Sequence, residues 1–257
     1  MKLDNARILL LGGTSGIGFA IAAACLDAGA IVIISSSTEQ RLSSALSRLR
    51  ASYPHAEDRI QGHLCDLSDP QTVEENLLRL LDLATDHNTV KLDHITYTAA
   101  NIPRLPPLSN YTAGSLGASF TIRVEAPILL GKLAGGYLHP GPQSSITFTS
   151  ASTATKPTPG RGLLTVLGAS TEGIAKGLAV DLAPIRVNVV APGTVDTELL
   201  RGLAGDNPGR FYDFLKSGTL LKRIGNPQDV AEAYLYLMRD ANVTGGVIHT
   251  DGGRLLQ

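Results

Sequence analysis

The chain has 257 residues, a hydrophobic fraction of 43% and a formal net charge of -1. This length suits one large α/β core, and the near-zero charge supplies no general field for nucleic acid or for a membrane. The two cysteines, Cys25 and Cys65, have no metal or disulfide spacing, so we expect buried thiols in a reducing, cytoplasmic setting. We expect no metal site, and no stretch approaches the ~20 apolar residues of a membrane-spanning helix.

Strand-like apolar runs alternate with helical patterns along almost the whole chain. We expect strands at residues 8–11, 30–35, 60–65, 94–99, 145–149, 185–190 and 247–250. We expect helices at residues 19–28, 38–50, from 69 onward, 115–138, 162–183 and 228–239. This alternation predicts a single-domain, Rossmann-type α/β fold. Its core would be a doubly wound parallel sheet of about seven strands with helices on both faces.

Three long segments show no clear period, at residues 102–114, 151–162 and 194–227. Each follows a predicted strand, which places it at the edge of the sheet where doubly wound folds bind ligands. Irregular segments of this length are usually functional.

The turn after the first strand carries the most informative motif. Gly12, Gly13, Gly16 and Gly18 stand between the apolar run and the following helix. Glycine lets a ligand approach the main chain, and the N-terminus of a helix directs its N–H groups toward an anion such as a pyrophosphate. In this strand–turn–helix context the motif indicates a dinucleotide site.

The sequence resembles the short-chain dehydrogenase/reductase family over nearly its whole length. The resemblance is carried by Gly12-x-x-x-Gly16-Ile17-Gly18, by Asp66-Leu67, by residues 185–197, and by residues 223–231 together with residues 245–246 and 251–253. It implies one NAD(P)-binding domain over residues 1–257, with residues 194–227 as a substrate lid. The residues that it implies for cofactor binding are Gly12, Thr14, Ser15, Ile17, Gly18, Asp66, Leu67, Ala99, Ala100, Pro192, Gly193, Val195 and Thr197.

The family also assembles through its long fourth and fifth helices. The resemblance therefore implies a homo-oligomer, a dimer or a tetramer. Gly131, Gly135, Gly173 and Gly177 would allow close helix approach there.

The end of the second strand decides which nicotinamide cofactor fits. An acid at this place would bind the ribose 2′-hydroxyl and repel a 2′-phosphate. This chain instead has Ser36, Ser37 and Thr38, whose hydroxyls can donate to phosphate oxygens. We therefore expect NADP(H), with Arg41 or Arg59 as the basic partner if either side chain reaches the site. A plain helix cap made of the serines is the other interpretation, and it is compatible with cofactor binding.

The chain departs from the family at its catalytic residues. The resemblance places Leu164 at the tyrosine that moves the proton, Gly168 at the lysine and Ala151 at the serine. No tyrosine or lysine lies between residues 158 and 176, so a small shift of the alignment does not restore the pair. Arg123 stands at the asparagine position and is our candidate catalytic residue. A structural salt bridge with Glu125 or another acid is the alternative.

A second Tyr-x-x-x-Lys pair, Tyr212 and Lys216, lies within the 194–227 segment. A displaced catalytic pair is one interpretation. Two surface residues one helical turn apart is the other.

The missing catalytic residues limit the reactions that the site can catalyse. Reduction of a ketone places negative charge on oxygen and needs a proton donor, whereas hydride addition to an iminium only neutralises charge. We therefore predict an NADPH-dependent oxidoreductase that reduces an imine, an iminium or a similarly activated small-molecule substrate. Apolar residues at 105–108 and 163–167 would line its pocket.

The altered positions are similar to those of divergent fungal members of the family in secondary metabolism and alkaloid biosynthesis. Some of these members also steer a Diels–Alder cyclisation, although this chain keeps the ordinary Pro192-Gly193 loop that the cyclising members alter. The alternative is a non-redox isomerase or cyclase, or an inactive cofactor-binding protein.

Overall fold

Seven parallel strands form one sheet in the computed structural model, which describes residues 3–100, 108–204 and 207–257. The strand order is β3-β2-β1-β4-β5-β6-β7, so the order reverses between β1 and β4. The strands are β1 (Arg7–Leu11), β2 (Ile31–Ser36), β3 (Ile60–Leu64), β4 (His94–Tyr97), β5 (Ser145–Thr149), β6 (Arg186–Pro192) and β7 (Val247–Thr250). The predicted doubly wound α/β fold is confirmed.

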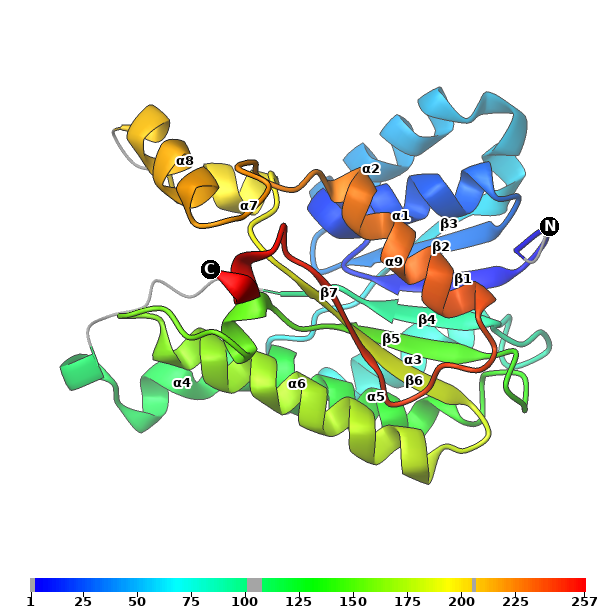
Figure 1. Cartoon of the computed structure of the whole chain (residues 1–257). Coiled ribbons are helices and arrows are strands. Elements are labelled where there is room, and N and C mark those ends of the chain that lie inside the picture. Colours follow the sequence, from blue (N-terminus) through cyan, green and yellow to red (C-terminus); the bar gives the residue numbers. More distant parts are fainter. Residues whose placement is uncertain (1–2, 101–107, 205–206) are drawn as a thin grey trace.

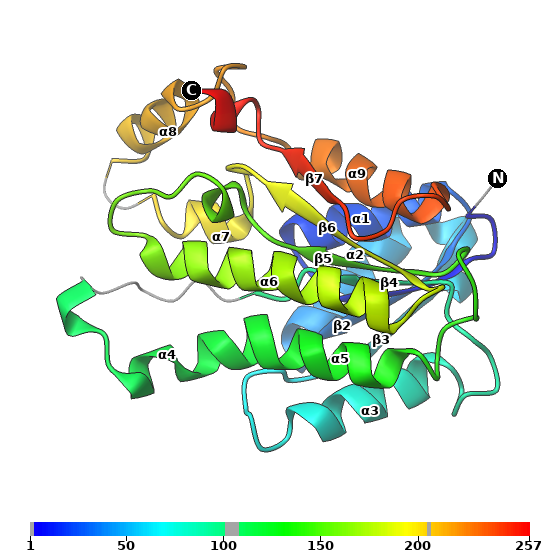
Figure 2. The ribbon, with the colours of Figure 1, turned by 60° about the horizontal axis from the view of Figure 1, so that its bottom comes forward.

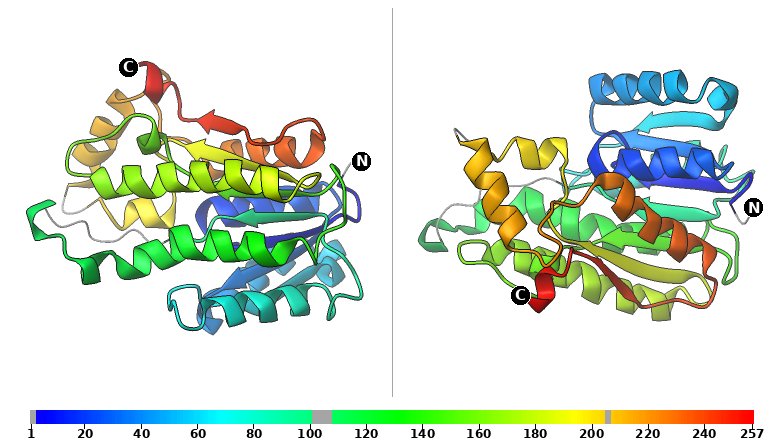
Figure 3. Two further views of the ribbon diagram at one scale, coloured as in Figure 1. Left: turned by 90° about the horizontal axis from the view of Figure 1, so that it is seen from below. Right: turned by 45° about the horizontal axis from the view of Figure 1, so that its top comes forward.

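Helices cover both faces of the sheet (Figure 1). One face carries α1 (Gly16–Asp27), α2 (Glu39–Ser52) and α9 (Pro227–Arg239). The other carries α3 (Val73–Ala84), α5 (Ala126–Ala134) and α6 (Gly162–Asp181). Figure 3 presents α5 and α6 from below and α1, α2 and α9 from above.

The side chains of β1 divide between two apolar cores. Ile8 and Leu10 pack with the residues of α1, α2 and α9, whereas Leu9 and Leu11 pack with those of α3, α5 and α6. Successive side chains of a strand point to opposite faces, so a strand covered on both sides is apolar throughout. Both thiols, Cys25 and Cys65, are free and buried in these cores, as expected.

Several predicted boundaries are wrong. The helix predicted from residue 69 begins at Val73, because the Asp69 carboxylate accepts a hydrogen bond from the Gln71 N–H at 2.9 Å and holds a turn before it. The strand predicted to end at residue 99 ends at Tyr97. The first helix begins at Gly16 rather than at residue 19, so part of the glycine motif belongs to the helix.

Two segments differ from the prediction. One predicted helix is interrupted, and one segment predicted as irregular contains helices. The helix predicted over residues 115–138 is divided into α4 (Ala113–Phe120), a π-helical turn (Thr121–Glu125) and α5. Figure 2 shows α4 and α5 following one another end to end. The segment 194–227, predicted as irregular, contains α7 (Glu198–Arg201) and α8 (Pro208–Ser217). Thr197 and Asn207 cap these two helices with their side-chain oxygens, a signal that the sequence contained.

α6 is long and apolar enough to cross a membrane by length and composition, contrary to the expectation from the sequence. Its most apolar window has a mean hydropathy of 1.3 because alanine, glycine and leucine outweigh its few charged residues. α6 packs against β5, β6 and α5. Helices that cover the sheet of a globular protein can be equally long and apolar, so length and composition alone assign no membrane role.

The glycines of α5 and α6 differ in what they contact. A Cβ atom on Gly131 would collide with the Leu178 side chain of α6, so this glycine serves packing between α5 and α6 of one chain. The nearest atom to a Cβ on Gly135 lies 3.7 Å away in Leu182, the residue after α6, and Gly135 itself is exposed. Of these two glycines, only Gly131 is occupied by packing within one chain. Gly173 and Gly177 have open space around them.

Arg186 closes the end of α9. Its buried guanidinium donates to the carbonyl oxygens of Leu237 and Met238 in the last turn of that helix, and to those of Pro142 and Val243. The last four carbonyl groups of a helix have no partner within it, so Arg186 supplies donors that α9 lacks. Burial lowers the pKa of this guanidinium, and the Asp240 carboxylate opposes that effect.

Arg186→Met keeps the apolar bulk and removes these donors. We expect the free energy of unfolding to fall by about 3 kcal/mol, because charged hydrogen bonds to buried carbonyl groups are lost. Urea denaturation followed by circular dichroism measures the change. Lys132→Met, which removes an exposed ion pair with Glu74, is the control and is expected to change stability far less. Equal losses in the two variants would contradict the capping role.

Candidate active site

The glycine turn between β1 and α1 lies against the end of β4. Gly12 has a φ of +88°, and a Cβ atom there would lie 2.6 Å from the amide nitrogen of Ala99. A Cβ atom on Gly18 would collide with the Gly12 carbonyl oxygen and with Thr98 Oγ1. Only glycine fits at either position. The turn therefore stands where the strand order reverses, which is where doubly wound sheets bind dinucleotides.

The N-terminus of α1 opens at this edge. The helix has no acidic residue in its first turn, and its N-cap residue Ser15 makes no capping bond with its side chain. Thr14, Ser15 and Ile17 are partly or fully exposed. One amide already has an acceptor, because the Gly16 N–H donates to Glu198 Oε2 at 3.0 Å. This combination of exposed N–H groups and a positive dipole end suits an anionic group.

The ends of β2 and β3 form the neighbouring part of the site. These strands pair in register at Ser36 and Leu64, so the residues that follow them share one edge. Asp66 is exposed, and its Oδ1 accepts hydrogen bonds from the Ser68 N–H at 3.0 Å and the Ser68 hydroxyl at 2.8 Å. The next residue, Leu67, is buried. The acid expected beside an adenine ring thus stands next to the hydroxyl cluster.

The hydroxyls after β2 are available to a ligand. Ser37 and Thr38 are exposed, and Thr38 is the N-cap of α2 without making a capping bond with its side chain. The helix-cap alternative therefore fails for Thr38. Arg41 is exposed in the first turn of α2. Arg59 donates to the Gly29 carbonyl at 3.0 Å, at the opposite edge of the sheet, so it does not reach these hydroxyls.

The loop after β6 lies against the end of β7 and against the glycine turn. β6 ends at Pro192, and the Gly193 N–H donates to the Thr250 carbonyl oxygen at 3.1 Å. Val195 is buried and forms a β-bridge with Gly225.

The same loop touches α1 through Thr197. A Cβ atom on Gly16 would lie 2.9 Å from Thr197 Cγ2. The loop that was expected to bind the cofactor and the glycine turn therefore meet in the structure.

The positions of the missing pair lie where β5 leads into α6. Ser150 Oγ lies 3.0 Å from the Gly168 carbonyl oxygen and 3.0 Å from Glu172 Oε1. A Cβ atom on Gly168 would lie 3.0 Å from Ala154 Cβ and 3.2 Å from Ser150 Oγ. α6 thus packs directly on the β5–α6 loop at the lysine position. Ala151 and Leu164, at the serine and tyrosine positions, are partly exposed.

The π-helical turn at Thr121–Glu125 has an identifiable cause. The Ala126 N–H bonds to the carbonyl five residues earlier, so the next carbonyl in line, that of Ile122, would need an N–H from Pro127. Proline has none. The hydroxyl of Tyr97, from the end of β4, donates to this Ile122 carbonyl instead. The turn that carries Arg123 is therefore fixed by a proline and a buried tyrosine.

Arg123 carries a buried nitrogen without a partner. Its Nε forms no hydrogen bond within residues 3–100, 108–204 and 207–257. The salt bridge with Glu125 allowed by the sequence does not form among these residues, and Glu125 is exposed. Burial lowers the pKa of Arg123, and interaction with Tyr97 opposes the effect. Burial raises the pKa of the Tyr97 phenol, so it stays protonated at neutral pH.

Several other predicted site residues fall outside this constellation. Tyr212 and Lys216 lie one turn apart on α8, where Lys216 Nζ is 3.5 Å from Asp213 Oδ1. Leu163 and Leu167 are buried, whereas Leu164 between them is partly exposed. Of the apolar segment 105–108, residues 105–107 lie outside the described part of the chain.

Three site residues were missed from the sequence. Tyr97, Glu172 and Glu198 each contact a residue that the sequence had singled out or its neighbour. Their partners are 25, 22 and 182 positions away, which no local pattern reveals. The one available signal was Pro127, whose missing N–H marks an irregular turn in a long helical pattern.

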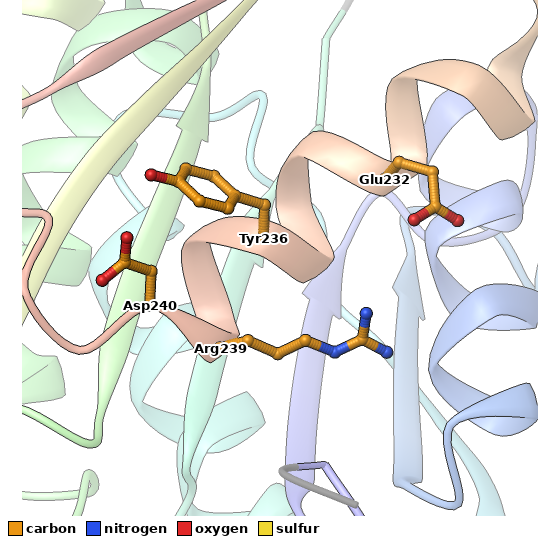
Figure 4. Close-up of a pocket in the computed structure, with 4 residues that line it drawn as sticks. All are labelled: Glu232, Tyr236, Arg239 and Asp240. Atoms are coloured by element: carbon orange, nitrogen blue, oxygen red, sulfur yellow. The ribbon is translucent and has the colours of Figure 1, made fainter.

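Two hollows lie on the surface of the described residues. A hollow of about 330 Å³ on α9 is lined by Glu232, Tyr236, Arg239 and Asp240, drawn in Figure 4. Tyr236 and Asp240 lie on one side of the helix and Arg239 on the other. The last turn of α9 stands at the amino edge of the sheet, opposite the glycine turn. A second hollow of about 390 Å³ adjoins the 194–227 segment at the end of β7.

The chain matches the family model described as SDR-like rossmann domain over residues 1–257. It is 42% identical to the short-chain dehydrogenase/reductase malC of Malbranchea aurantiaca, covering 99% of this chain and 96% of that protein. It is 36% identical to ucsE of an Acremonium species, covering 99% and 97%.

Two solved structures extend the comparison. The MalC reductase/Diels-Alderase from Malbranchea aurantiaca has a TM-score of 0.94 at 41% identity, covering 100% of this chain and 98% of that one. A short chain dehydrogenase from Burkholderia cenocepacia in complex with NADP has a TM-score of 0.83 at 28% identity, covering 99% of both chains.

Tyr97→Phe tests the cause of the π-helical turn. The variant leaves the Ile122 carbonyl without its donor, so we expect a loss of about 1–3 kcal/mol in unfolding free energy and faster amide exchange over residues 121–127. Urea denaturation and hydrogen exchange measure the two effects. Tyr53→Phe removes a hydroxyl that bonds to Asp27 near the surface and serves as the matched control. If both variants behave alike, the turn does not depend on Tyr97.

Proposed function

This chain belongs to the family of SDR-like Rossmann oxidoreductases, and we propose that it is an NADP(H)-dependent reductase of activated, cationic C=N acceptors. One observation carries the proposal. The chain retains the sterically required glycine turn but packs α6 onto Ser150 at the position where the family places its lysine. It thus keeps a cradle for a dinucleotide while lacking the usual proton donor.

The residues present fit a nicotinamide dinucleotide phosphate. Gly12 and Gly18 leave the main chain open to close approach, and Thr14, Ser15 and Ile17 would hold the pyrophosphate at the start of α1. When bound, the cofactor would supply the hydride. The Burkholderia cenocepacia relative in complex with NADP supports the choice of this cofactor class.

The ribose end of the site favours the phosphorylated cofactor. The exposed hydroxyls of Ser37 and Thr38, with the guanidinium of Arg41 in the same turn of helix, would hold a 2′-phosphate. Asp66 follows the neighbouring strand β3, beside the expected adenine position. No carboxylate occurs among residues 36–38 to repel a phosphate.

The substrate end favours an acceptor that needs no proton. Leu164 and Ala151 offer no acidic group there, and hydride addition to an iminium carbon requires none. Arg123 is the one cation that the π-helical turn brings to this part of the site, with its Nε buried and unpaired among the described residues. We assign it the role of holding an electronegative oxygen of the substrate or the cofactor.

A following cyclisation belongs to the same proposal. The similar MalC protein is described as a reductase and a Diels-Alderase, which supports a role for this chain in secondary metabolism, including alkaloid biosynthesis. A pocket that holds a reduced product folded can lower the barrier to ring closure by about 7–11 kcal/mol. A non-redox isomerase or cyclase is the second candidate, favoured by the absence of an acid at residues 151, 164 and 168.

We further propose that the protein is a homo-oligomer of the reducing cytoplasm, assembled through α6. The outward face of this helix includes Val166 at 48% exposure and Val180 at 77%. Gly173 and Gly177 lie on the same helix with open space around them, so another helix can approach closely there.

Arg123→Asn tests the assigned catalytic role. With a cyclic iminium acceptor that carries an oxygen substituent, we expect kcat to fall by about tenfold or more, because the group that orients an electronegative oxygen of the substrate or the cofactor is lost. The Kd of NADPH should change little. Absorbance of the nicotinamide band measures turnover, and Arg123→Lys, which keeps the charge, should be less impaired. Unchanged turnover would make Arg123 structural. Failure of the wild type to bind NADPH would favour the isomerase alternative.

Ser37→Asp tests the choice of cofactor. A carboxylate at this position repels a 2′-phosphate and accepts from a 2′-hydroxyl, so we expect the preference for NADPH over NADH to fall by about tenfold or more. Fluorescence titration gives the two Kd values. Ser47→Asp, which adds the same charge to an exposed position farther along α2, is the control. An equal shift in both variants would point to net charge rather than to a 2′-phosphate site.

A further inference from the structure

We propose that Glu198 is a latch that occupies a phosphate position of the dinucleotide cradle. On this proposal, binding of the cofactor requires the Glu198 carboxylate to leave α1 and the turn α7 to shift with it. The inference rests on the proposed function, because it assumes that the cradle receives a pyrophosphate.

The contact joins two parts of the chain that are far apart in sequence. Glu198 Oε2 lies 3.0 Å from the Gly16 nitrogen, across 182 residues. Gly16 has a φ of +50° and opens α1, so its N–H points out of the helix rather than to a partner within it. The first turn of α1 has no acidic residue, and Ser15 does not cap it. The carboxylate of Glu198 therefore acts as the anion at this helix end.

The latch is held in place by its own short helix. Thr197 Oγ1 accepts from the Leu200 N–H at 3.3 Å and fixes the start of α7. Arg201 at the end of α7 forms two hydrogen bonds with the Asp196 carboxylate, at 3.0 Å and 3.2 Å. Asp196 in turn is tied to the main chain of Gly225, which accepts from its N–H at 2.9 Å. α7 can thus deliver or withdraw Glu198 as one unit.

A pyrophosphate and this carboxylate are competitors. Both are anions that accept hydrogen bonds from N–H groups at the start of α1, where the helix dipole favours one negative group. Two anions at this place repel each other. Thr197, the neighbour of Glu198, lies against Gly16, so withdrawal of α7 with the carboxylate would also move the loop that follows β6. On this proposal, cofactor affinity and the position of α7 are coupled.

The test compares the wild type with Glu198→Gln, which keeps the size of the side chain and removes its charge. We expect the variant to bind NADPH about fivefold more tightly or better, a typical size for coupling between two events at one site. Nicotinamide fluorescence gives the Kd. Adenosine 2′-monophosphate, which has no pyrophosphate, serves as a second probe, and its Kd should be the same for both proteins.

A charge control and an NMR measurement distinguish the latch from a general effect of removing a negative charge. Asp213→Asn removes one negative charge from α8 of the same segment and should leave the Kd of NADPH unchanged. In amide NMR spectra without ligand, Glu198→Gln should shift the Gly16 N–H signal. Equal or weaker NADPH binding by Glu198→Gln would overturn the latch while leaving the proposed function intact. No NADPH binding by any of these proteins would overturn both.

Discussion

The whole site depends on one close approach of main chains. The turn after β1 touches the end of β4 so closely that a side chain on Gly12 or Gly18 would overlap neighbouring backbone atoms. This approach is possible only because glycine adopts the backbone angles and leaves the space. It brings the start of α1 to the reversal point of the sheet, and the loops after β4 and β6 meet it there.

The chemistry of the site depends on two further structural features near that turn. α6 approaches the β5–α6 loop at Gly168, the lysine position, where a Cβ atom would lie 3.0 Å from Ala154 Cβ. The helix between α4 and α5 takes a π-helical turn because Pro127 cannot donate and Tyr97 can. At the first place the proton-transfer group of the family is missing, which supports the proposed hydride transfer to an acceptor that already carries positive charge. The second holds an arginine whose Nε is buried and which would bind an electronegative oxygen.

The fold was predictable from the sequence because its signals are local. A strand buried on both faces is continuously apolar, as at Ile8–Leu10, and the glycine motif identifies its own turn. The contacts that shape the site are not local. Glu198 reaches Gly16 and Tyr97 reaches Ile122 only after the chain has folded, and neither residue belongs to a motif. The two short helices α7 and α8 have local signals in their caps, Thr197 and Asn207, but the segment that contains them has no clear hydrophobic period.

The proposed function requires that the site reduces a cationic acceptor much better than a ketone. The most direct measurement is kcat/KM of the wild-type protein with NADPH for a cyclic iminium and for the ketone of the same ring and substituents. General acid catalysis contributes about 10²–10⁴ in rate, so a site without it should prefer the iminium by about 100-fold or more. Comparable values for the two substrates would contradict the claim, because the chain would then possess a proton donor at its active site.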